Sequence, residues 1–336
     1  MRTLLEHEGV RCVDLVNFRL VHIFLKWTNH VPPTALVLGN ELLVHFAVVY
    51  EVCANMSAYI EAMDYAMCRD LVLATVGYTA YLLSFSIFGG TKETVLDSPR
   101  YTWWVAISFQ SVIFPALCYL ALSDIGASMP DATLAEKMVA RWPAGARAES
   151  WPFVRLWLLS FFGYMTKDMV GVYKIGSVYI VHHIVCIYLA VSFLMLDLTP
   201  MIMIAGGTVA EVGSSCVNAF YMGWTHGRQW LRYPLGLVMT LSNLFVIWLL
   251  VPFNRAVPAT GWSSPTFLLT VTVNLLCVER NRATLSIFSA SETIIPGGKG
   301  KPAKSVMGPT TDIPMWFTLV GSAIGYYTVQ YLAAHP

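Results

Sequence analysis

The sequence predicts an all-α membrane protein with many spans, and two observations lead to that prediction. Of its 336 residues, 56% are hydrophobic and only 12% are charged, whereas an average soluble domain is about 25% charged. Apolar runs of roughly 20 residues, the length that crosses a bilayer as a helix, recur along the chain. The net charge of +1 provides no basic face for phosphates, so we exclude nucleic acid as a partner.

Nine apolar runs are candidate spans, because each approaches the length of a membrane-crossing helix. The fourth and the eighth are short or have polar ends, and such a segment crosses only where protein buries its ends. In chain order, the nine runs are 34–53, 71–89, 102–122, 153–170, 175–195, 200–222, 233–252, 264–278 and 314–333.

The distribution of Lys and Arg supports this number of spans. If all nine cross, and Lys167 at the end of the fourth span is counted with the loop that follows, fifteen of the 21 basic residues fall on one side of the membrane and five on the other, with Arg155 inside a span. Cytosolic loops carry the excess of basic residues in membrane proteins. We therefore expect a cytosolic N-terminus and a C-terminus that is lumenal or otherwise outside the cytosol.

Three segments outside the spans have their own character. Residues 1–33 form a cytosolic N-terminal segment, in which 12–27 suit either a helix lying in the membrane interface or a plain surface helix. Residues 130–142 predict a short amphipathic helix on the lumenal side, with Asp131 as its N-cap. Residues 281–313 are rich in Gly, Pro, Ser and Lys and predict a flexible cytosolic linker before the C-terminal span in 314–336.

The fifth and sixth spans contain ionisable side chains, which are costly at bilayer depth and are therefore candidates for a functional site. With a rise of 1.5 Å per residue, His182 and His183 lie about 10–12 Å from the cytosolic face and Glu211 lies about 17 Å from it. Asp168 ends the fourth span at the same face and is shallower. One polar pocket in the cytosolic half of the membrane could therefore contain all four side chains.

Polar residues of the sixth span recur at spacings of three and four, which places Thr208, Glu211, Ser215 and Asn218 on one stripe of a helix. Such a stripe must face protein or water. Hydrogen bonding between helices explains its hydroxyl residues, whereas a carboxylate is a costly way to join helices. Structural hydrogen bonding is likewise an alternative for either histidine. Three amides in other spans could line the same cavity: Gln110, Asn243 and Asn274.

We expect neither a metal nor a bound cofactor. The eight histidines form no HxxxH or HxxHH pattern, and the seven cysteines form no CxxC pattern. The clustered ligands that a zinc or di-iron site needs are therefore missing from the sequence.

Three motifs follow one another along the chain: GYMTKD, which ends at Asp168, the histidine pair of the next span, and AEVGSSCVN, which ends at Asn218. In this order they resemble the TLC domain of the TRAM–LAG–CLN family. The resemblance covers residues 100–280, after two additional spans in 34–99, and implies a ring of six helices around a lipid-sized cavity. By position, Ser214 also matches the family pattern. Gln110 stands where many relatives have histidine, and Gly213 and Ser215 stand where Ser and Pro are common.

The resemblance implies a protein of the endoplasmic reticulum that handles lipid and influences membrane lipid composition. Its partners would be membrane lipids, including a long-chain acyl or sphingoid lipid. The ceramide synthases of the family carry paired aspartates after the histidines, whereas residues 199–218 contain only Glu211 as an acidic residue. The chain therefore looks closer to the branches that are not ceramide synthases.

An acyltransferase resembling ceramide synthase is the first alternative, with acyl-CoA as its co-substrate. His182 or His183 would act as nucleophile or general base, and Glu211 or Asp168 would orient the imidazole. The substrate would be held by polar groups of the third and sixth spans, namely Gln110, Ser214, Ser215 and Asn218. A transporter or trafficking receptor is the second alternative, although no pair of Gly/Pro-broken spans in matching halves favours a transporter.

Overall fold

The structure is a computed structural model. It describes residues 63–89, 94–95, 98–143, 150–172, 177–196, 198–224, 229–256, 273–274, 277–278, 280–281, 284, 290–295 and 304–309. The predicted interfacial helix and first span, as well as the last span, lie outside the described residues. Most of the eighth span, 264–278, lies outside them as well.

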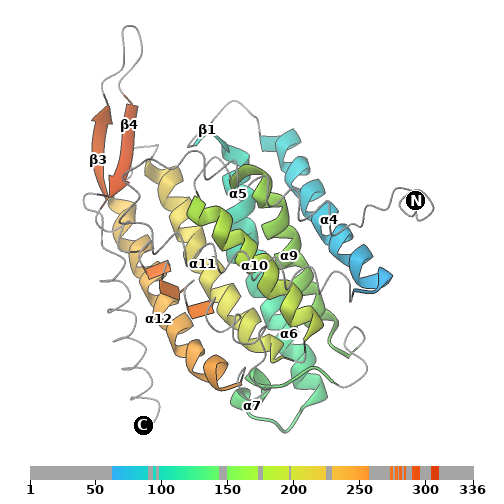
Figure 1. Ribbon diagram of the computed structural model, residues 1–336. Helices are drawn as coiled ribbons and strands as arrows, with labels where there is room; N and C mark the ends of the chain where they lie inside the picture. The colour runs from blue at the N-terminus through green and yellow to red at the C-terminus, as the bar shows by residue number, and fades with distance from the viewer. Residues whose placement is uncertain are drawn as a thin grey trace, which may run out of the picture. The chain divides into compact units, whose positions relative to one another are not determined.

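The described chain is predominantly helical, as predicted. Its long helices are α4 (Tyr65–Gly89), α9 (Pro152–Val172), α10 (Ser177–Met195), α11 (Pro200–Trp224) and α12 (Arg232–Ala256) (Figure 1). Another long helical stretch combines α5 (Arg100–Ser108), the π-helical turn η2 (Phe109–Ile113) and α6 (Phe114–Ser128). Two short elements complete the helices, α7 (Leu134–Met138) and the 3-10 turn η3 (Gln229–Leu231).

Four helical stretches among the described residues are long and apolar enough to cross a membrane. They are Tyr65–Ile87, Arg100–Ser128, Pro200–Gly223 and Arg232–Asn254, and they coincide with the second, third, sixth and seventh predicted spans. Helices α9 and α10 lie where the fourth and fifth spans were expected. Whether those two helices cross a membrane stays a prediction.

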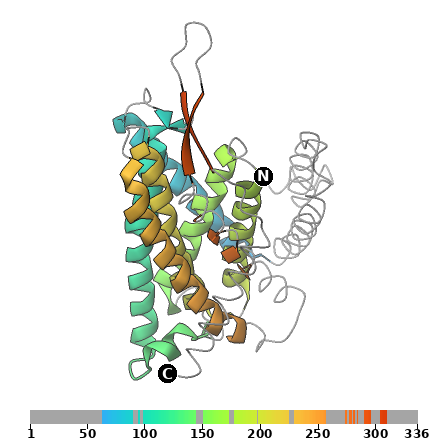
Figure 2. The ribbon, with the colours of Figure 1, turned by 90° about the vertical axis from the view of Figure 1, so that its left-hand side faces the viewer.

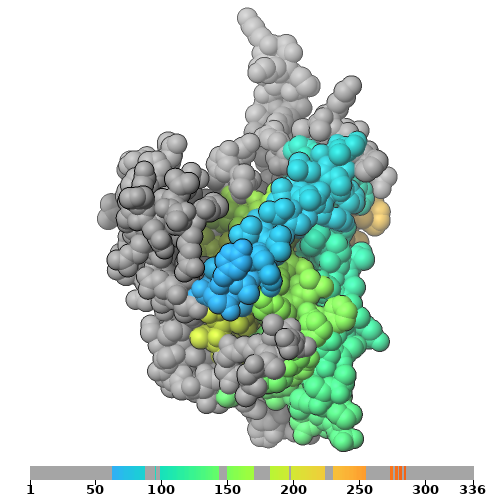
Figure 3. Space-filling view, turned by 90° about the vertical axis from the view of Figure 1, so that its right-hand side faces the viewer, coloured from blue at the N-terminus to red at the C-terminus, as the bar shows by residue number. Residues whose placement is uncertain are grey.

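Exposed apolar side chains form a stripe on α12. Leu237, Leu241, Leu244 and Trp248 recur at spacings of three and four, and each is about half exposed. Helix α4 also exposes large apolar side chains, among them Val72, Leu73, Val76 and Leu83, and Figure 3 shows the outer surface of this helix. Contiguous apolar surface of this kind is unfavourable in water and is typical of a face that contacts lipid or protein.

The chain divides into two compact units, which are described separately. Unit 1 comprises Met1–Thr79, Leu158–Leu196 and Ser263–Thr272, and unit 2 comprises Ala80–Trp157, Asp197–Trp262 and Val273–Pro336. Helices α4 and α9 each contribute one part to each unit. These boundaries do not follow the predicted division at residues 100 and 280.

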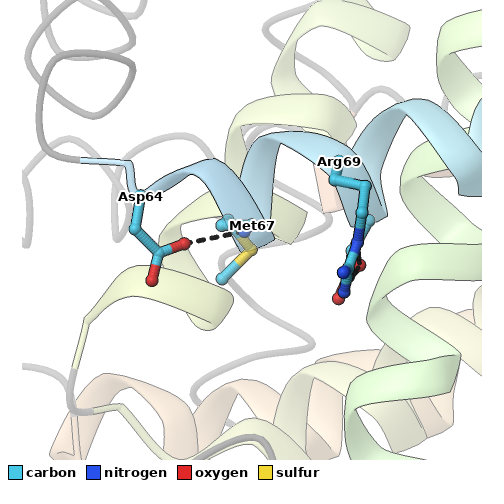
Figure 4. A network of polar contacts seen from close by, with 4 residues as sticks. Asp64, Met67 and Arg69 are labelled. Atoms are coloured by element: carbon cyan, nitrogen blue, oxygen red, sulfur yellow. Dashed lines mark hydrogen bonds and ion pairs between the residues drawn. The ribbon is translucent and has the colours of Figure 1, made fainter.

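In unit 1, α4 begins six residues before the predicted span because Asp64 caps it. The carboxylate of Asp64 accepts a hydrogen bond from the backbone N–H of Met67 at 2.7 Å (Figure 4), which satisfies a donor that the helix itself leaves open. Further along, α4 lies directly against α9. A Cβ atom on Gly163 would lie 2.5 Å from the carbonyl oxygen of Ala74, so only glycine allows this approach of the two backbones.

In unit 2, α11 packs against α12 and also against α5, η2 and α6 (Figures 1 and 2). The two contact pairs that fix direction are Trp103 with Tyr221 and Ser111 with Ser215. They show that the α5–η2–α6 stretch runs antiparallel to α11, as the alternation of the third and sixth spans predicts. Large buried side chains fill this unit, including Phe114, Trp157 and Phe220, each 0% exposed.

Helix α7 lies within the predicted amphipathic segment 130–142 but is shorter, and Thr133 caps it instead of Asp131. Thr133 and Glu136 form a capping box: the backbone N–H of Glu136 donates to Thr133 Oγ1 at 3.3 Å, and the backbone N–H of Thr133 donates to Glu136 Oε2 at 2.7 Å. The sequence Thr-x-x-Glu at 133–136 allows both bonds, whereas Asp131 as the cap would satisfy fewer donors.

The structure also contains two short antiparallel sheets, which the all-α prediction did not include. Strand β1 (Thr94–Val95) pairs with β2 (Ser98–Pro99), and β3 (Ala290–Ile295) pairs with β4 (Lys304–Pro309). The second pair lies inside the predicted linker 281–313, which is therefore partly regular. Thr293, Ile294 and Ile295 favour a strand, and the sequence PGGKGKPA between the strands is rich in turn residues.

Candidate functional site

The candidate site is centred on a carboxylate buried in unit 2. Glu211 of α11 is 5% exposed, and the side-chain amide nitrogen of Gln110 donates a hydrogen bond to its Oε2 at 2.8 Å. The Oε1 of Gln110 in turn accepts from Nδ2 of Asn218 at 2.9 Å. Since a carboxylate oxygen accepts and Asn218 donates, the two contacts agree on the orientation of the Gln110 amide. The three side chains form one hydrogen-bonded chain, called here the acid–amide chain.

The π-helical turn η2 presents Gln110 to α11. Two consecutive residues of this turn contact the same helix, because the hydroxyl of Ser111 donates to Ser215 Oγ at 2.7 Å. In a regular α-helix, consecutive side chains point about 100° apart and rarely face one partner together. Isolated π-helical turns occur frequently at functional sites.

The other end of the polar stripe is held by Trp157. Its indole N–H donates to Thr208 Oγ1 at 3.0 Å, and the ring lies against Gly207, where a Cβ atom would come within 2.7 Å of the ring. The predicted stripe Thr208, Glu211, Ser215 and Asn218 is therefore matched by protein partners from η2 and from the start of α9.

Ser214 lies at the edge of this stripe and has a different partner. Its Oγ accepts a hydrogen bond from Nη1 of Arg280 at 2.9 Å, and Nη2 of Arg280 donates to Ser242 Oγ of α12 at 3.0 Å. Gly213 makes room for this arrangement, since a Cβ atom there would collide with both Arg280 and Ser242. Ser214 and Asn218 thus contact different side chains, and whether they hold the same substrate group stays a prediction.

The two asparagines predicted to line the same cavity have partners away from the acid–amide chain. Asn243 of α12 is 3% exposed, and its Nδ2 donates to Thr284 Oγ1 at 2.6 Å and to Asn281 Oδ1 at 3.4 Å. Asn274 donates from Nδ2 to Asn254 Oδ1 at 3.1 Å. The segment that contains Arg280, Asn281 and Thr284 is thereby held against α12.

The two histidines and Asp168 lie in unit 1. The rings of His182 and His183 are 5.5 Å apart at an interplanar angle of 78°, and His183 is 9% exposed. The carboxylate of Asp168 lies 3.4 Å from Lys167 Nζ and interacts electrostatically with His183. The structure thus joins Asp168 with His183 in one unit, and Gln110, Glu211, Ser215 and Asn218 in the other. The predicted pocket that contains both groups stays a prediction.

Sequence analysis missed several residues of the site. Arg280 was counted among the loop cations because it follows the end of the eighth predicted span by two residues. The spacing of Cys277, Arg280, Asn281 and Thr284 continues a helical pattern beyond that end and could have indicated its inward position. The contact of Ser111 with Ser215 depends on the π-helical turn, which no residue pattern in the sequence indicates.

Comparison with known proteins yields no match: no protein-family model, no curated protein and no solved structure matches the chain.

Proposed function

We propose that the chain is a multi-pass membrane protein that binds a membrane lipid and influences membrane lipid composition. In this proposal a TLC-type ring of six helices holds the lipid, and the protein resides in the endoplasmic reticulum with its N-terminus in the cytosol. The single observation that carries the proposal is the acid–amide chain, which joins Glu211, Gln110 and Asn218 across two helices long enough to span a membrane.

A buried carboxylate between two candidate spans is a costly way to join helices, because hydroxyl or amide groups do so without a charge. Carboxylate and amide groups together both accept and donate hydrogen bonds. They can therefore bind the ester, amide or hydroxyl groups that lie next to the acyl chains of membrane lipids. The exposed apolar side chains of α4 and α12 support a location in the bilayer.

Capture of a photoactivatable lipid by the purified full-length protein tests this proposal. The wild type would be compared with Glu211→Leu and Glu211→Gln, at equal protein amounts and in the same detergent. We expect Glu211→Leu to lose most of the capture and Glu211→Gln to keep a part of it, since Gln still hydrogen-bonds Gln110. Glu136→Gln, which changes a carboxylate on the exposed helix α7, is the matched control. Equal capture by wild type and Glu211→Leu would overturn the proposal.

Unit 1 favours a second candidate function, N-acyl transfer from acyl-CoA. The supporting observation is the pair of adjacent imidazoles of His182 and His183, whose ring centroids are 5.5 Å apart, in the same unit as Asp168. In this candidate function the carboxylate would stabilise the protonated ring that a general base becomes. The acceptor amine would attack the thioester carbonyl as the imidazole takes its proton. The carbon–sulfur bond then breaks, and the CoA thiolate leaves and receives the proton. Alternatively, the imidazole nitrogen itself attacks and an acyl-histidine forms before the amine displaces it.

Purified protein incubated with acyl-CoA and a sphingoid base distinguishes the two functions. If the chain transfers acyl groups, the wild type forms an N-acyl product. His182→Ala/His183→Ala then reduces the rate by about 100-fold or more, the contribution typical of general acid–base catalysis. Lipid capture by that double variant would remain. Absence of product from the wild type, or an unchanged rate in the double variant, would refute acyl transfer.

A further inference from the structure

We infer that Arg280 binds the phosphate of a lipid headgroup, and that Asn243 accepts a hydrogen bond from a donor on the same headgroup. The site lies between α11, α12 and the described residues Arg280, Asn281 and Thr284. The inference builds on the proposed lipid binding and specifies the class of headgroup: a phosphate together with a hydroxyl or ammonium group.

The first observation is the notch at Gly213. A Cβ atom at this position would collide with the guanidinium of Arg280 and with Ser242, so the absence of a side chain on α11 is what admits the cation. Bringing a guanidinium between two candidate spans is costly. A residue that serves only to join helices does not require a charge or a glycine opposite to it.

The second observation concerns the two hydroxyls that hold the guanidinium. Ser214 Oγ donates to the carbonyl of Ala210 at 3.1 Å, and Ser242 Oγ donates to the carbonyl of Met239 at 2.8 Å. Both hydroxyl hydrogens are thus directed to backbone, and both oxygens accept from Arg280. These two contacts are made by neutral groups, and they fix the plane of the guanidinium. An oriented guanidinium matches the oxygens of a phosphate.

The third observation is an acceptor on Asn243. The hydroxyl of Thr284 donates to the carbonyl of Arg280 at 3.0 Å, so its oxygen is the acceptor for Asn243 Nδ2. This fixes the amide orientation and directs Oδ1 away from Thr284. Among the described residues, Oδ1 of Asn243 is buried and has no hydrogen-bond partner. A buried acceptor is costly if nothing donates a hydrogen bond to it, and native structures rarely contain one in that condition.

The two groups lie close together, because Thr284 accepts a hydrogen bond from Asn243 and donates one to the backbone carbonyl of Arg280. Arg280 supplies a positive charge, and Asn243 needs a donor. Phosphatidylethanolamine offers a phosphate with an ammonium donor, whereas phosphatidylcholine has the same net charge but a choline group with no hydrogen to donate. Comparison of these two lipids therefore separates the contribution of Asn243 from that of Arg280.

Native mass spectrometry of the full-length protein in detergent, titrated with each lipid, measures the two affinities. We expect the wild type to prefer phosphatidylethanolamine. Arg280→Gln should weaken binding of both lipids by about tenfold or more, as loss of a hydrogen bond to a charged group implies. Asn243→Leu should remove the preference and leave phosphatidylcholine binding unchanged. Thr284→Val is the matched control, because it removes the partner of Nδ2 and leaves Oδ1 of Asn243 in place.

Arg232→Gln controls for the loss of one positive charge, since the Arg232 guanidinium interacts with the neighbouring Tyr233 at the start of α12. Unchanged lipid affinity in Arg280→Gln, or an unchanged preference in Asn243→Leu, would overturn the inference. Inorganic phosphate is titrated in the same way. If it binds the wild type through Arg280 while neither lipid does, the ligand of Arg280 is free phosphate and the inferred lipid headgroup is wrong. Glu211→Leu is titrated with the same lipids in parallel. Its affinity tests lipid binding at the acid–amide chain, so that failure of the proposed function is distinguished from failure of the Arg280 site.

Discussion

Gln110 and Glu211 lie 101 positions apart in the sequence, and their side chains meet at 2.8 Å in the interior of unit 2. Gln110 links Glu211 to Asn218, because each of its two polar atoms binds one of them. The residue at position 110 therefore decides whether the carboxylate and the asparagine act together.

Replacing Gln110 by leucine should lower the free energy of unfolding. The change removes a donor to Glu211 and an acceptor for Asn218 and leaves buried polar groups behind, which costs about 1–3 kcal/mol. Thermal unfolding of the purified protein in detergent measures the effect. Gln110→His should restore part of the stability, since a neutral imidazole has one donor and one acceptor. A Gln110→Leu protein as stable as the wild type would show that the acid–amide chain contributes nothing to the free energy of unfolding.

The contact between Trp157 and Thr208 should contribute a measurable coupling energy. Trp157→Phe keeps an aromatic ring in a fully buried position but removes the indole N–H that binds Thr208. Thr208→Val removes the acceptor. A double-mutant cycle should give a coupling of about 0.5–1.5 kcal/mol, the net value of a typical hydrogen bond. A coupling of zero would mean that the two side chains do not interact in solution.

Two glycines of unit 1 should respond oppositely to alanine. Gly163→Ala places a methyl group against the backbone of α4 and should destabilise the protein by about 1–3 kcal/mol, as overpacking does. Gly77 of α4 has nothing within 4 Å of its Cβ position. Gly77→Ala should therefore be neutral or stabilise the helix by roughly 0.5–1 kcal/mol. Chemical denaturation of both variants checks the pair, and equal losses at the two positions would contradict the predicted close approach.

The sequence is informative about the helices because hydrophobic runs and their spacing act locally. Four predicted spans coincide with helices long and apolar enough to cross a membrane, and the spacing of Thr208, Glu211, Ser215 and Asn218 correctly placed them on one stripe. Gln110 was expected to line a cavity with Glu211, and its side chain lies against that carboxylate, since an amide in an apolar run requires another polar group nearby.

Features that depend on tertiary contacts were harder to predict. The π-helical turn at Gln110 differs from an α-helix by one hydrogen-bond register, which no residue pattern in this chain marks. The position of Arg280 depends on the notch at Gly213, 67 residues earlier in the sequence, and the strands β3 and β4 arise from pairing within a segment whose composition resembles a linker. The position of Arg280 is thus determined by a residue distant in sequence, whereas the two strands are determined by their pairing with each other.

The capping box of α7 should make this helix sensitive to acid. Hydrogen bonds from the backbone and then the hydroxyl of Thr133 lower the pKa of the Glu136 carboxyl, so the folded state holds its proton less tightly than the unfolded chain does. The contribution to stability is therefore fully present above the ordinary glutamate value of about 4.3 and is lost as the pH falls through the lower folded pKa.

Hydrogen exchange of the α7 amides, expressed relative to their intrinsic rates, measures this loss between pH 6 and pH 3. We expect the protection of these amides to fall over that interval in the wild type. In Glu136→Gln it should be lower at pH 6 and nearly independent of pH, because the amide accepts the same hydrogen bonds without a charge. Equal pH dependence in the two proteins would assign the acid sensitivity of α7 to another group, since the substituted side-chain amide does not titrate.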